Sequence, residues 1–270
     1  MPTPKELLDS GHLNAAIEAL TQEVREAPAD PQKRTFLFEL LAFAGEWDRA
    51  EKQIVAAAGA DAPSQMAAGL YRGLLQAERD RALVFAGRAR PRFLRPVPAY
   101  AEKSLAALGR IAGGDLDGAR ALLDEAEEER PSLSGRRGEA PFEDLRDFDD
   151  VLGGVVEMVF QGRYTWFPLE HARSLEPNPP KKLRDLIWPG ARITADDGTS
   201  GDVFLFALYA GSHASSDELV KLGRMTDWKS LSDDLQVGMG LRSFLLGGEE
   251  DVSIFELGSF ELDPREGVPS

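Results

Sequence analysis

The chain has 270 residues, 43% of them hydrophobic, which is enough for two domains with apolar cores. Its formal net charge of −15 argues against nucleic acid or an anionic membrane as a partner. The sequence has no cysteine, which excludes disulfides and cysteine-ligated metals. The N-terminus lacks the basic and apolar regions of a signal peptide, and no window is apolar enough for a membrane span, so we expect a cytoplasmic protein.

A spacing of 34 residues, from Gly11 to Gly45, organises the first half of the chain. Each glycine is followed by an apolar residue two positions later and an alanine three positions after that, and a third copy begins at Gly114. The glycine allows a tight turn between two antiparallel helices, and the small alanine lets them approach closely. The pattern resembles the tetratricopeptide repeat (TPR) and predicts roughly seven helices stacked as a short solenoid over residues 1–131.

The densest apolar segment is Arg34–Trp47, which reads RTFLFELLAFAGEW. Apolar side chains occur on two faces of this helix, so we expect it to lie between neighbouring helices. It is expected to begin after the pair Asp30-Pro31 and to end at Gly45. Farther along, the sequence predicts a long helix at Ser64–Phe85, a proline-rich loop at Arg88–Pro98, and a helical hairpin of Tyr100–Ile111 and Leu116–Glu129.

Two oppositely charged strips stand out in the sequence. The stretch Arg79–Arg95 contains six arginines and one acidic residue, Asp80, whereas Glu139–Asp150 contains six acidic residues and one arginine, Arg146. They are either two solvated surfaces or two strips that face each other between the halves of the protein.

Residues 131–141 are rich in turn-forming residues and mark the expected domain boundary. This gives a TPR-like helical-repeat domain over residues 1–131 and a smaller α+β domain over residues 139–270. The apolar stretch Val151–Phe160 is predicted as a short helix, and the following alternation predicts a small, curved antiparallel sheet. Its expected strands are 163–168, 171–175, 191–195, 202–208, 236–246 and 252–257, with a helical turn or loop over 181–188 and a capped helix over 216–223.

The sequence carries no motif for catalysis, a cofactor or a metal. The three histidines, His12, His171 and His213, form no zinc-binding pair, and the segment Gly211–Ser215 lacks the nucleophile elbow of a hydrolase. The segment Gly238–Arg242 lacks the third glycine of a dinucleotide site, and no phosphate-binding loop occurs. We therefore expect no catalytic residue, no cofactor and no metal.

Four sequence blocks stand out: Arg34–Trp47, Glu78–Pro91 (ERDRALVFAGRARP), Gly162–Pro168 (GRYTWFP) and Leu183–Pro189 (LRDLIWP). Together they resemble the ImpE family, also called TagJ, accessory proteins of bacterial type VI secretion. The last two blocks are the more specific, because a helical repeat does not account for them. The resemblance implies a helical-repeat domain, a smaller α+β domain and non-enzymatic work. It also implies binding to the small subunit of the contractile sheath, through a helix near that subunit's N-terminus, and so an indirect link to the sheath-recycling AAA+ ATPase.

Large aromatic residues and one arginine are the candidate partner-binding residues under this hypothesis. Core packing is the simpler explanation for each aromatic residue, because such side chains are usually buried. The candidates are Phe36 and Phe43 in the first domain, and Tyr164, Trp166, Trp188 and Arg184 in the second.

Two other functions stay open at the level of the sequence. One is a generic TPR-like scaffold with a different protein partner. The other is an enzyme with a site in the α+β domain, which the missing motifs disfavour. Its candidate residues are Arg163, Arg184, Asp185 and His171, although Arg184 and Asp185 are more simply explained as a structural ion pair or loop network.

Overall fold

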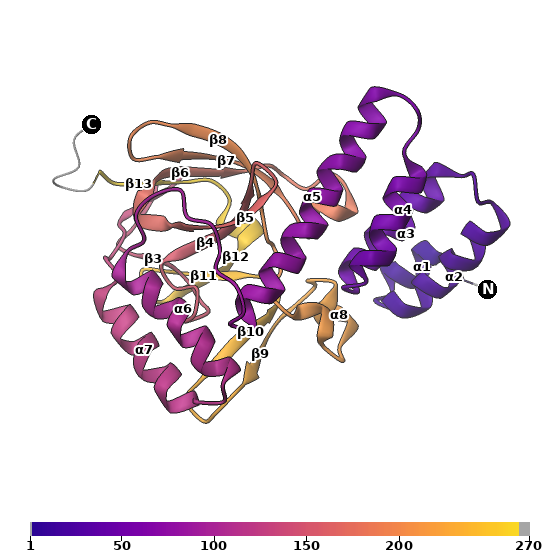
Figure 1. Cartoon of the computed structure of the whole chain (residues 1–270). Helices are drawn as coiled ribbons and strands as arrows, with labels where there is room; N and C mark the ends of the chain where they lie inside the picture. The colour runs from indigo at the N-terminus through magenta and orange to yellow at the C-terminus, as the bar shows by residue number, and fades with distance from the viewer. Residues whose placement is uncertain (1, 265–270) are drawn as a thin grey trace.

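Helices occupy the first half of the chain and strands dominate the second (Figure 1). The computed structural model describes residues 2–264. The helices of the first half are α1 (Pro4–Asp9), α2 (Leu13–Glu26), α3 (Pro31–Phe43), α4 (Trp47–Ala57), α5 (Ala62–Phe85), α6 (Ala99–Ala112) and α7 (Leu116–Glu129).

The second half contains an antiparallel sheet and several short helices, as the predicted fold class requires. The strands are β1 (Gly135–Arg137), β2 (Ala140–Phe142), β3 (Leu145–Asp147), β4 (Val155–Phe160), β5 (Arg163–Pro168), β6 (Ala172–Pro177), β7 (Gly190–Ala195), β8 (Ser200–Leu205), β9 (Thr226–Ser230), β10 (Gln236–Gly240), β11 (Ser243–Leu246), β12 (Glu250–Ser253) and β13 (Phe260–Leu262). The short helices are η1 (Leu169–His171), η2 (Leu183–Leu186), η3 (Ser212–Ala214), α8 (Glu218–Lys221) and α9 (Ile254–Leu257).

Helix α3 is fixed at both ends by its own sequence. The Asp30 carboxylate accepts hydrogen bonds from two backbone N–H groups of the first turn, and Pro31 lies at the first helical position. At the other end, Gly45 has a φ of 70°, a left-handed conformation that stops the helix. Every residue from Leu37 to Phe43 is buried, which confirms the expected middle helix.

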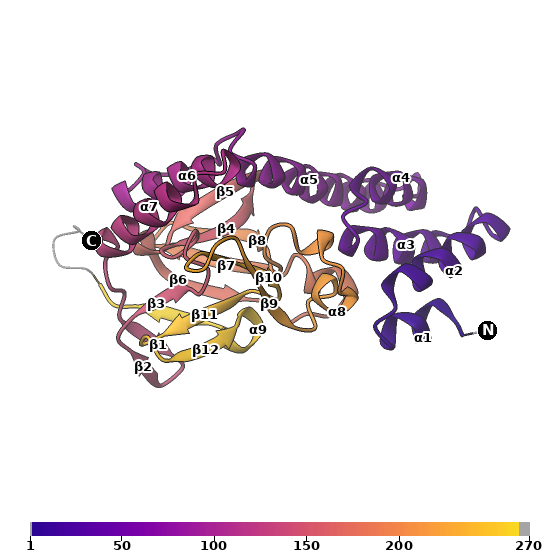
Figure 2. The same cartoon turned by 90° about the horizontal axis from the view of Figure 1, so that it is seen from below.

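Helix α5 joins two separate groups of helices. Helices α1–α4 stack at one end of α5, whereas the α6–α7 hairpin lies against the strands at the other end (Figures 1 and 2). Arg120 and Arg130, on and next to α7, pair with Asp150 and Asp144 of the second half at 2.7 and 2.6 Å. The expectation of one continuous solenoid is wrong in this respect. Helix α5 has 24 residues and spans about 36 Å, so it separates the third repeat copy from the first two.

The glycine turns of the first two repeat copies contact the second half of the chain. A β-carbon at Gly11 would lie 2.7 Å from Cδ2 of Leu219 in α8, and one at Gly45 would clash with the ring of His213 in η3. The third turn, at Gly114, has no atom within 4 Å of that position. Glycine at the first two turns therefore allows both the left-handed conformation and a close approach between the halves.

The predicted helix over Val151–Phe160 is wrong, because only residues 155–160 form a regular element and that element is strand β4. Its side chains alternate between two cores. Val155 and Val159 pack toward the helices, and Val156 and Met158 pack into the other core. Since both faces are buried, the strand is almost continuously apolar, and such a run cannot be distinguished from a buried helix by periodicity.

Two cores hold the molecule together. The larger sheet has the strand order β2-β1-β13-β6-β7-β8-β4-β5, and a smaller sheet has the order β12-β11-β3. One core lies between the larger sheet and the helices, and the other is formed by residues of these two sheets. Strands β9 and β10 form a separate hairpin. Within residues 2–264, every helix is too short or too polar to cross a bilayer.

Several predicted boundaries in the second half differ from the structure. The expected strand 236–246 is divided into β10 and β11, and the expected strand 252–257 is divided into β12 and α9. The helix expected over 216–223 is only α8, with Asp217 rather than Ser216 as its N-cap. The three-residue strands β1, β2, β3 and β13 are too short to produce a detectable alternation.

Candidate partner-binding site

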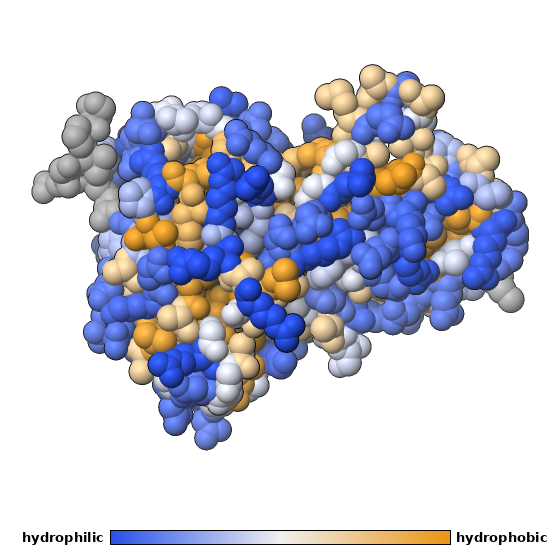
Figure 3. Space-filling model, in the orientation of Figure 1, coloured by the Kyte–Doolittle hydropathy of each residue, from blue (hydrophilic) through white to orange (hydrophobic). Residues whose placement is uncertain are grey.

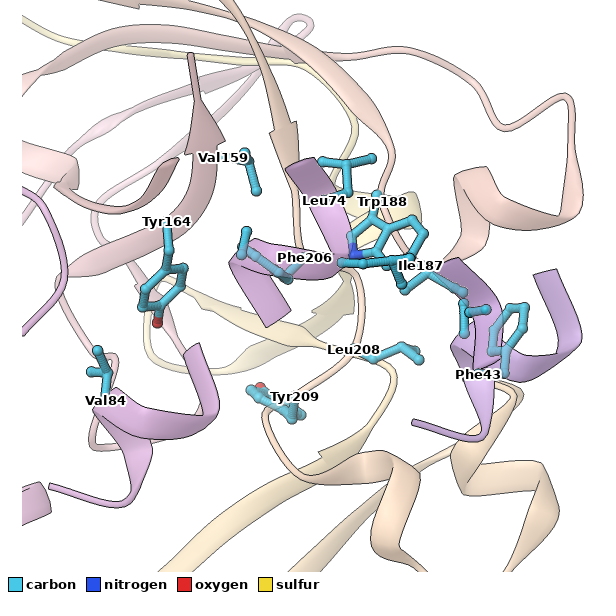
Figure 4. Close-up of a cluster of buried hydrophobic side chains, with 14 of the residues drawn as sticks. Phe43, Leu74, Val84, Val159, Tyr164, Ile187, Trp188, Phe206, Leu208 and Tyr209 are labelled. Carbon is cyan, nitrogen blue, oxygen red and sulfur yellow. The ribbon is translucent and has the colours of Figure 1, made fainter. Parts of the chain in front are cut away.

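The six candidate partner-binding residues divide into two groups in the structure. The side chains of Phe43, Tyr164, Trp166 and Trp188 are buried, with at most 3% of their surface exposed. Figure 4 shows Phe43, Tyr164 and Trp188 among the other buried apolar side chains between the helices and the strands. These residues contact the rest of the chain, and a contact with a partner stays a prediction for them. Phe36 and Arg184 are only partly buried and line a surface groove.

The groove lies between α1, α3 and η2, so both halves of the chain contribute to it. Its volume is about 770 Å³. Apolar side chains and charged or polar side chains both line it, a mixture that suits a site for a protein segment. The apolar residues are Leu8, Pro31, Phe36 and Leu183, and the polar ones are Lys5, Asp9, Gln32, Thr35, Glu39, Lys182 and Arg184.

Arg184, which lines the groove, connects η2 to the helices. Its guanidinium donates hydrogen bonds to the carboxylate of Glu39 in α3 and to the hydroxyl of Tyr71 in α5, and it stacks 4.8 Å from the centre of the Tyr71 ring. Burial raises the pKa of Glu39, although the charge of Arg184 opposes this effect. Asp185 accepts hydrogen bonds from the backbone N–H groups of Lys181 and Lys182 and so fixes the start of η2.

Trp188 follows η2 in the chain, is buried, and contacts both α3 and α5. Its indole N–H donates a 3.0 Å hydrogen bond to Glu78 of α5, and its ring stacks on Phe38 of α3 at a centroid distance of 6.4 Å. Glu78 in turn lies 3.6 Å from Arg81. Through Glu78, the contacts of Trp188 lead to a buried cluster of charged residues.

We define the buried charge cluster as Arg81, Asp147, Glu157 and Arg242, whose side chains are at most 3% exposed. Arg81 of α5 donates two hydrogen bonds to Glu157 of β4, at 2.7 and 2.6 Å, and a third to the carbonyl of Leu208. Arg242 donates to Glu157 and, at 2.7 Å, to Asp147 of β3. The cluster thus ties a helix of the first half to three segments of the second.

Glu157 is the centre of this cluster. Burial alone would raise its pKa, but Arg81 and Arg242 outweigh the burial and hold the pKa of Glu157 at about 2. The hydroxyl of Tyr164 also donates to Glu157, and the indole N–H of Trp166 donates to that hydroxyl at 2.6 Å. Two of the predicted partner-binding aromatics therefore complete the hydrogen bonds of a buried carboxylate.

Sequence inspection missed Glu157, Asp147 and Arg242 as important residues. The available signal was an isolated charge inside an apolar run: Glu157 interrupts VVEMVF, and an ionised side chain is rarely buried unless it is paired. The partners of Glu157 lie 76 and 85 residues away in sequence, so their identity could not be inferred from spacing.

The hypothesis that the two charged strips face each other is wrong. Within residues 2–264, no ion pair joins the two strips. The acidic side chains of Glu139–Asp150 that are paired bind arginines outside Arg79–Arg95, and the arginines of Arg79–Arg95 that are paired bind other carboxylates. In the acidic strip, the ion pairs are Asp144 with Arg130, Asp147 with Arg242, and Asp150 with Arg120 and Arg146. In the basic strip, they are Arg79 with Asp48 and Glu51, Arg81 with Glu78 and Glu157, Arg90 with Glu102, and Arg95 with Asp196 and Asp197.

The proline-rich loop Arg88–Pro98 lies along the edge of β5. The backbone N–H of Arg92 donates to the carbonyl of Tyr164 at 3.2 Å, and the N–H of Trp166 donates to the carbonyl of Arg92 at 3.0 Å. This pairing is parallel and covers part of an edge that would otherwise be open.

The candidate residues for an enzyme do not converge. Arg184 lines the groove, Arg163 lines a different depression, and His171 lies 4.0 Å from Asp196. Among residues 2–264, no group of three or more histidine, aspartate or glutamate side chains is arranged to hold a metal ion.

Comparison with known proteins identifies the family. The family model described as ImpE protein matches residues 139–261. The chain is also 37% identical, over 262 residues, to the type VI secretion system accessory component TagJ of Pseudomonas aeruginosa strain PAO1, covering 97% of this chain and 92% of that protein. The chain belongs to the ImpE family. A crystal structure of a Vibrio parahaemolyticus protein has the same fold, with a TM-score of 0.89 and 26% identity over 97% of this chain and 98% of that one.

The four sequence blocks that resemble the ImpE family meet in space in this member. Arg184 and Trp188 of the fourth block contact Glu39 of the first and Glu78 of the second. Tyr164 of the third block and Arg81 of the second block both donate hydrogen bonds to Glu157. The blocks therefore form the contact between the helices and the sheet, with the groove at its solvent-exposed end.

Proposed function

We propose that this ImpE-family chain is an accessory component of a type VI secretion system that works as an adaptor. In this role it binds the helix near the N-terminus of the small sheath subunit, and through that subunit it is linked indirectly to the sheath-recycling ATPase. The observation that carries the proposal is the 37% identity to the accessory component TagJ over 97% of the chain.

The groove between α1, α3 and η2 is the proposed docking site. An amphipathic helix binds a groove by placing a few apolar side chains, spaced three or four residues apart, into an apolar floor. The apolar lining includes Phe36 of α3 and Leu183 of η2, one from each half of the chain. Since Arg184 fixes η2 to α3 and α5, these elements of the groove are held in place before binding, which reduces the entropy lost on binding.

Titration calorimetry with a synthetic peptide of the sheath subunit's N-terminal helix tests the proposal. Changing Phe36 and Leu183 together to alanine is expected to weaken binding at least about tenfold, because both apolar contacts are lost. The matched control changes Met66 and Leu70 to alanine; these are two exposed apolar residues of α5, outside the groove. The control should bind within about twofold of the unchanged chain.

Two outcomes would contradict the proposal. If the unchanged chain does not bind the peptide or the intact sheath subunit, the adaptor role fails, and a helical scaffold for another partner becomes the better explanation. If the peptide binds equally to the groove variant and the control variant, the adaptor role stands and the groove is the wrong site. Urea unfolding of each variant shows that a loss of binding is not a loss of folding.

A further inference from the structure

Three arginines near the end of α5 are left without a partner. Within residues 2–264, the side chains of Arg88, Arg92 and Arg163 make no ion pair and no hydrogen bond. Three carboxylates of the acidic strip, Asp144, Asp147 and Asp150, pair with other arginines. Since the whole chain has a net charge of −15, an unneutralised group of arginines is a local exception.

Arg92 and Arg163 line one surface depression of about 350 Å³, and Arg88 precedes it in the loop. Leu83 of α5 also lines it and is 46% exposed. Asp80 is the only acidic side chain in the lining, and Arg90, which pairs with Glu102, completes the basic side. Figure 3 shows strongly hydrophilic and hydrophobic atoms side by side around the lower end of α5.

The backbone fixes the elements that carry these arginines. Gly87, with a φ of 67°, turns the chain directly after α5, and its β-carbon position lies 3.1 Å from Cα of Gly109. Arg92 is held by its two hydrogen bonds to β5. Arg163 follows a tight turn in which Gln161 and Gly162 both have positive φ, and Gly73 of α5 lies against that turn. The arrangement is therefore present before any partner binds.

We propose that this depression, which we call the arginine site, binds an acidic segment of another protein that carries an apolar side chain. The guanidinium group of arginine binds a carboxylate through two parallel hydrogen bonds. The exposed Leu83, which lines the same depression, offers an apolar contact. A nucleic acid is disfavoured, because a long polyanion would extend beyond this small depression along a chain whose net charge is −15. The arginine site shares no lining residue with the groove, so this inference is independent of the proposed function.

Fluorescence anisotropy with a labelled peptide, Glu-Glu-Asp-Leu-Phe-Asp-Glu-Glu, tests the proposal on the full chain. The double variant Arg88→Glu/Arg163→Glu is expected to bind at least about tenfold more weakly, and added salt should weaken binding to the unchanged chain. The control is Arg25→Glu/Arg173→Glu, which reverses two exposed arginines outside the arginine site and should stay within about threefold.

A second measurement tests the apolar contact. Replacing Leu-Phe in the peptide by Gly-Gly and changing Leu83 to glutamine should each weaken binding a few-fold, and the two changes together should cost little more than either alone. Additive losses would show that Leu83 does not contact the peptide.

Three results would overturn the proposal. The first is no saturable binding to the unchanged chain up to about 1 mM peptide. The second is an equal loss of binding in the two double variants. The third is tighter, arginine-dependent binding of a twelve-nucleotide oligothymidine or of anionic phospholipid vesicles, which would identify a general polyanion surface instead.

Discussion

The buried charge cluster and the groove use the same kinds of side chain but differ in their access to water. In the cluster, Arg81 and Glu157 are at most 3% exposed and bind each other through two hydrogen bonds. At the groove, the side chains of Arg184 and Glu39 are 12% and 10% exposed and line an open surface. An ion pair without water must be satisfied within the protein, whereas one at the edge of a groove can also shape a binding surface. Changes in the cluster should therefore affect stability more than changes at the groove.

Matched Arg→Lys substitutions test this difference most directly. Lysine keeps the charge but cannot form the two-pronged contact. Arg81→Lys should lower the free energy of unfolding by about 3 kcal/mol. The reason is that acceptors among the Glu157 carboxylate oxygens and the Leu208 carbonyl would stay buried without a hydrogen-bond donor. Arg184→Lys should cost only about 1 kcal/mol, because water can reach its site.

Urea unfolding of both lysine variants measures this difference. Equal losses, or a larger loss for Arg184→Lys, would show that solvent access does not separate the two sites. The exposed arginine of the Arg192–Asp202 pair is a suitable control, and Arg192→Lys should change stability by less than about 0.5 kcal/mol.

The glycine turns of the repeat extend the comparison to the contact between the halves. Gly45→Ala should lower the free energy of unfolding by about 2–3 kcal/mol, because a β-carbon there strains a positive φ and clashes with His213. Gly114→Ala should cost only about 1 kcal/mol, because its φ of 79° is strained but the space around it is open. Thermal unfolding of the two variants measures the difference, and equal losses would mean that His213 moves aside freely.

A further expected effect is a pH dependence next to the buried cluster. Burial raises the pKa of Asp149, and the charge of Asp147 raises it further. Hydrogen bonds from the N–H groups of Gly238 and Val151 lower the pKa, but the net result is a pKa of about 7. The ordinary value is 3.8, so between pH 4 and 7 the folded chain binds more protons at this group than the unfolded chain. The contribution of Asp149 to stability should therefore fall as the pH rises through this range.

Asp149→Asn should remove this dependence. The variant also loses one hydrogen bond, but this loss is the same at every pH. The difference in the free energy of unfolding between the variant and the unchanged chain should therefore shift in favour of the variant by about 1–2 kcal/mol from pH 5.5 to pH 8. Unfolding curves at several pH values measure this change. A constant difference over the range would show that Asp149 is ionised throughout it.

Local signals in the sequence were sufficient for most of the helices. Asp30, Pro31 and Gly45 mark the ends of α3 because capping and left-handed turns depend only on neighbouring residues. Strand β4 was predicted as a helix because burial on both faces removes the alternation that reveals a strand. For the candidate site, aromatic residues were recognised, but their exposure was not, because exposure depends on which other elements cover them.

The sequence by itself determined the repeat period, the ends of α3, the two-part fold class and the membership in the ImpE family, since each depends on residues close together or on the pattern of the whole chain. Only the tertiary structure decided which charges pair. Asp147 and Glu157 bind arginines from distant segments, and the paired arginines of the Arg79–Arg95 strip bind carboxylates of several different segments. Ion pairing depends on distances of a few ångströms in space, and folding sets those distances between residues that the sequence keeps far apart.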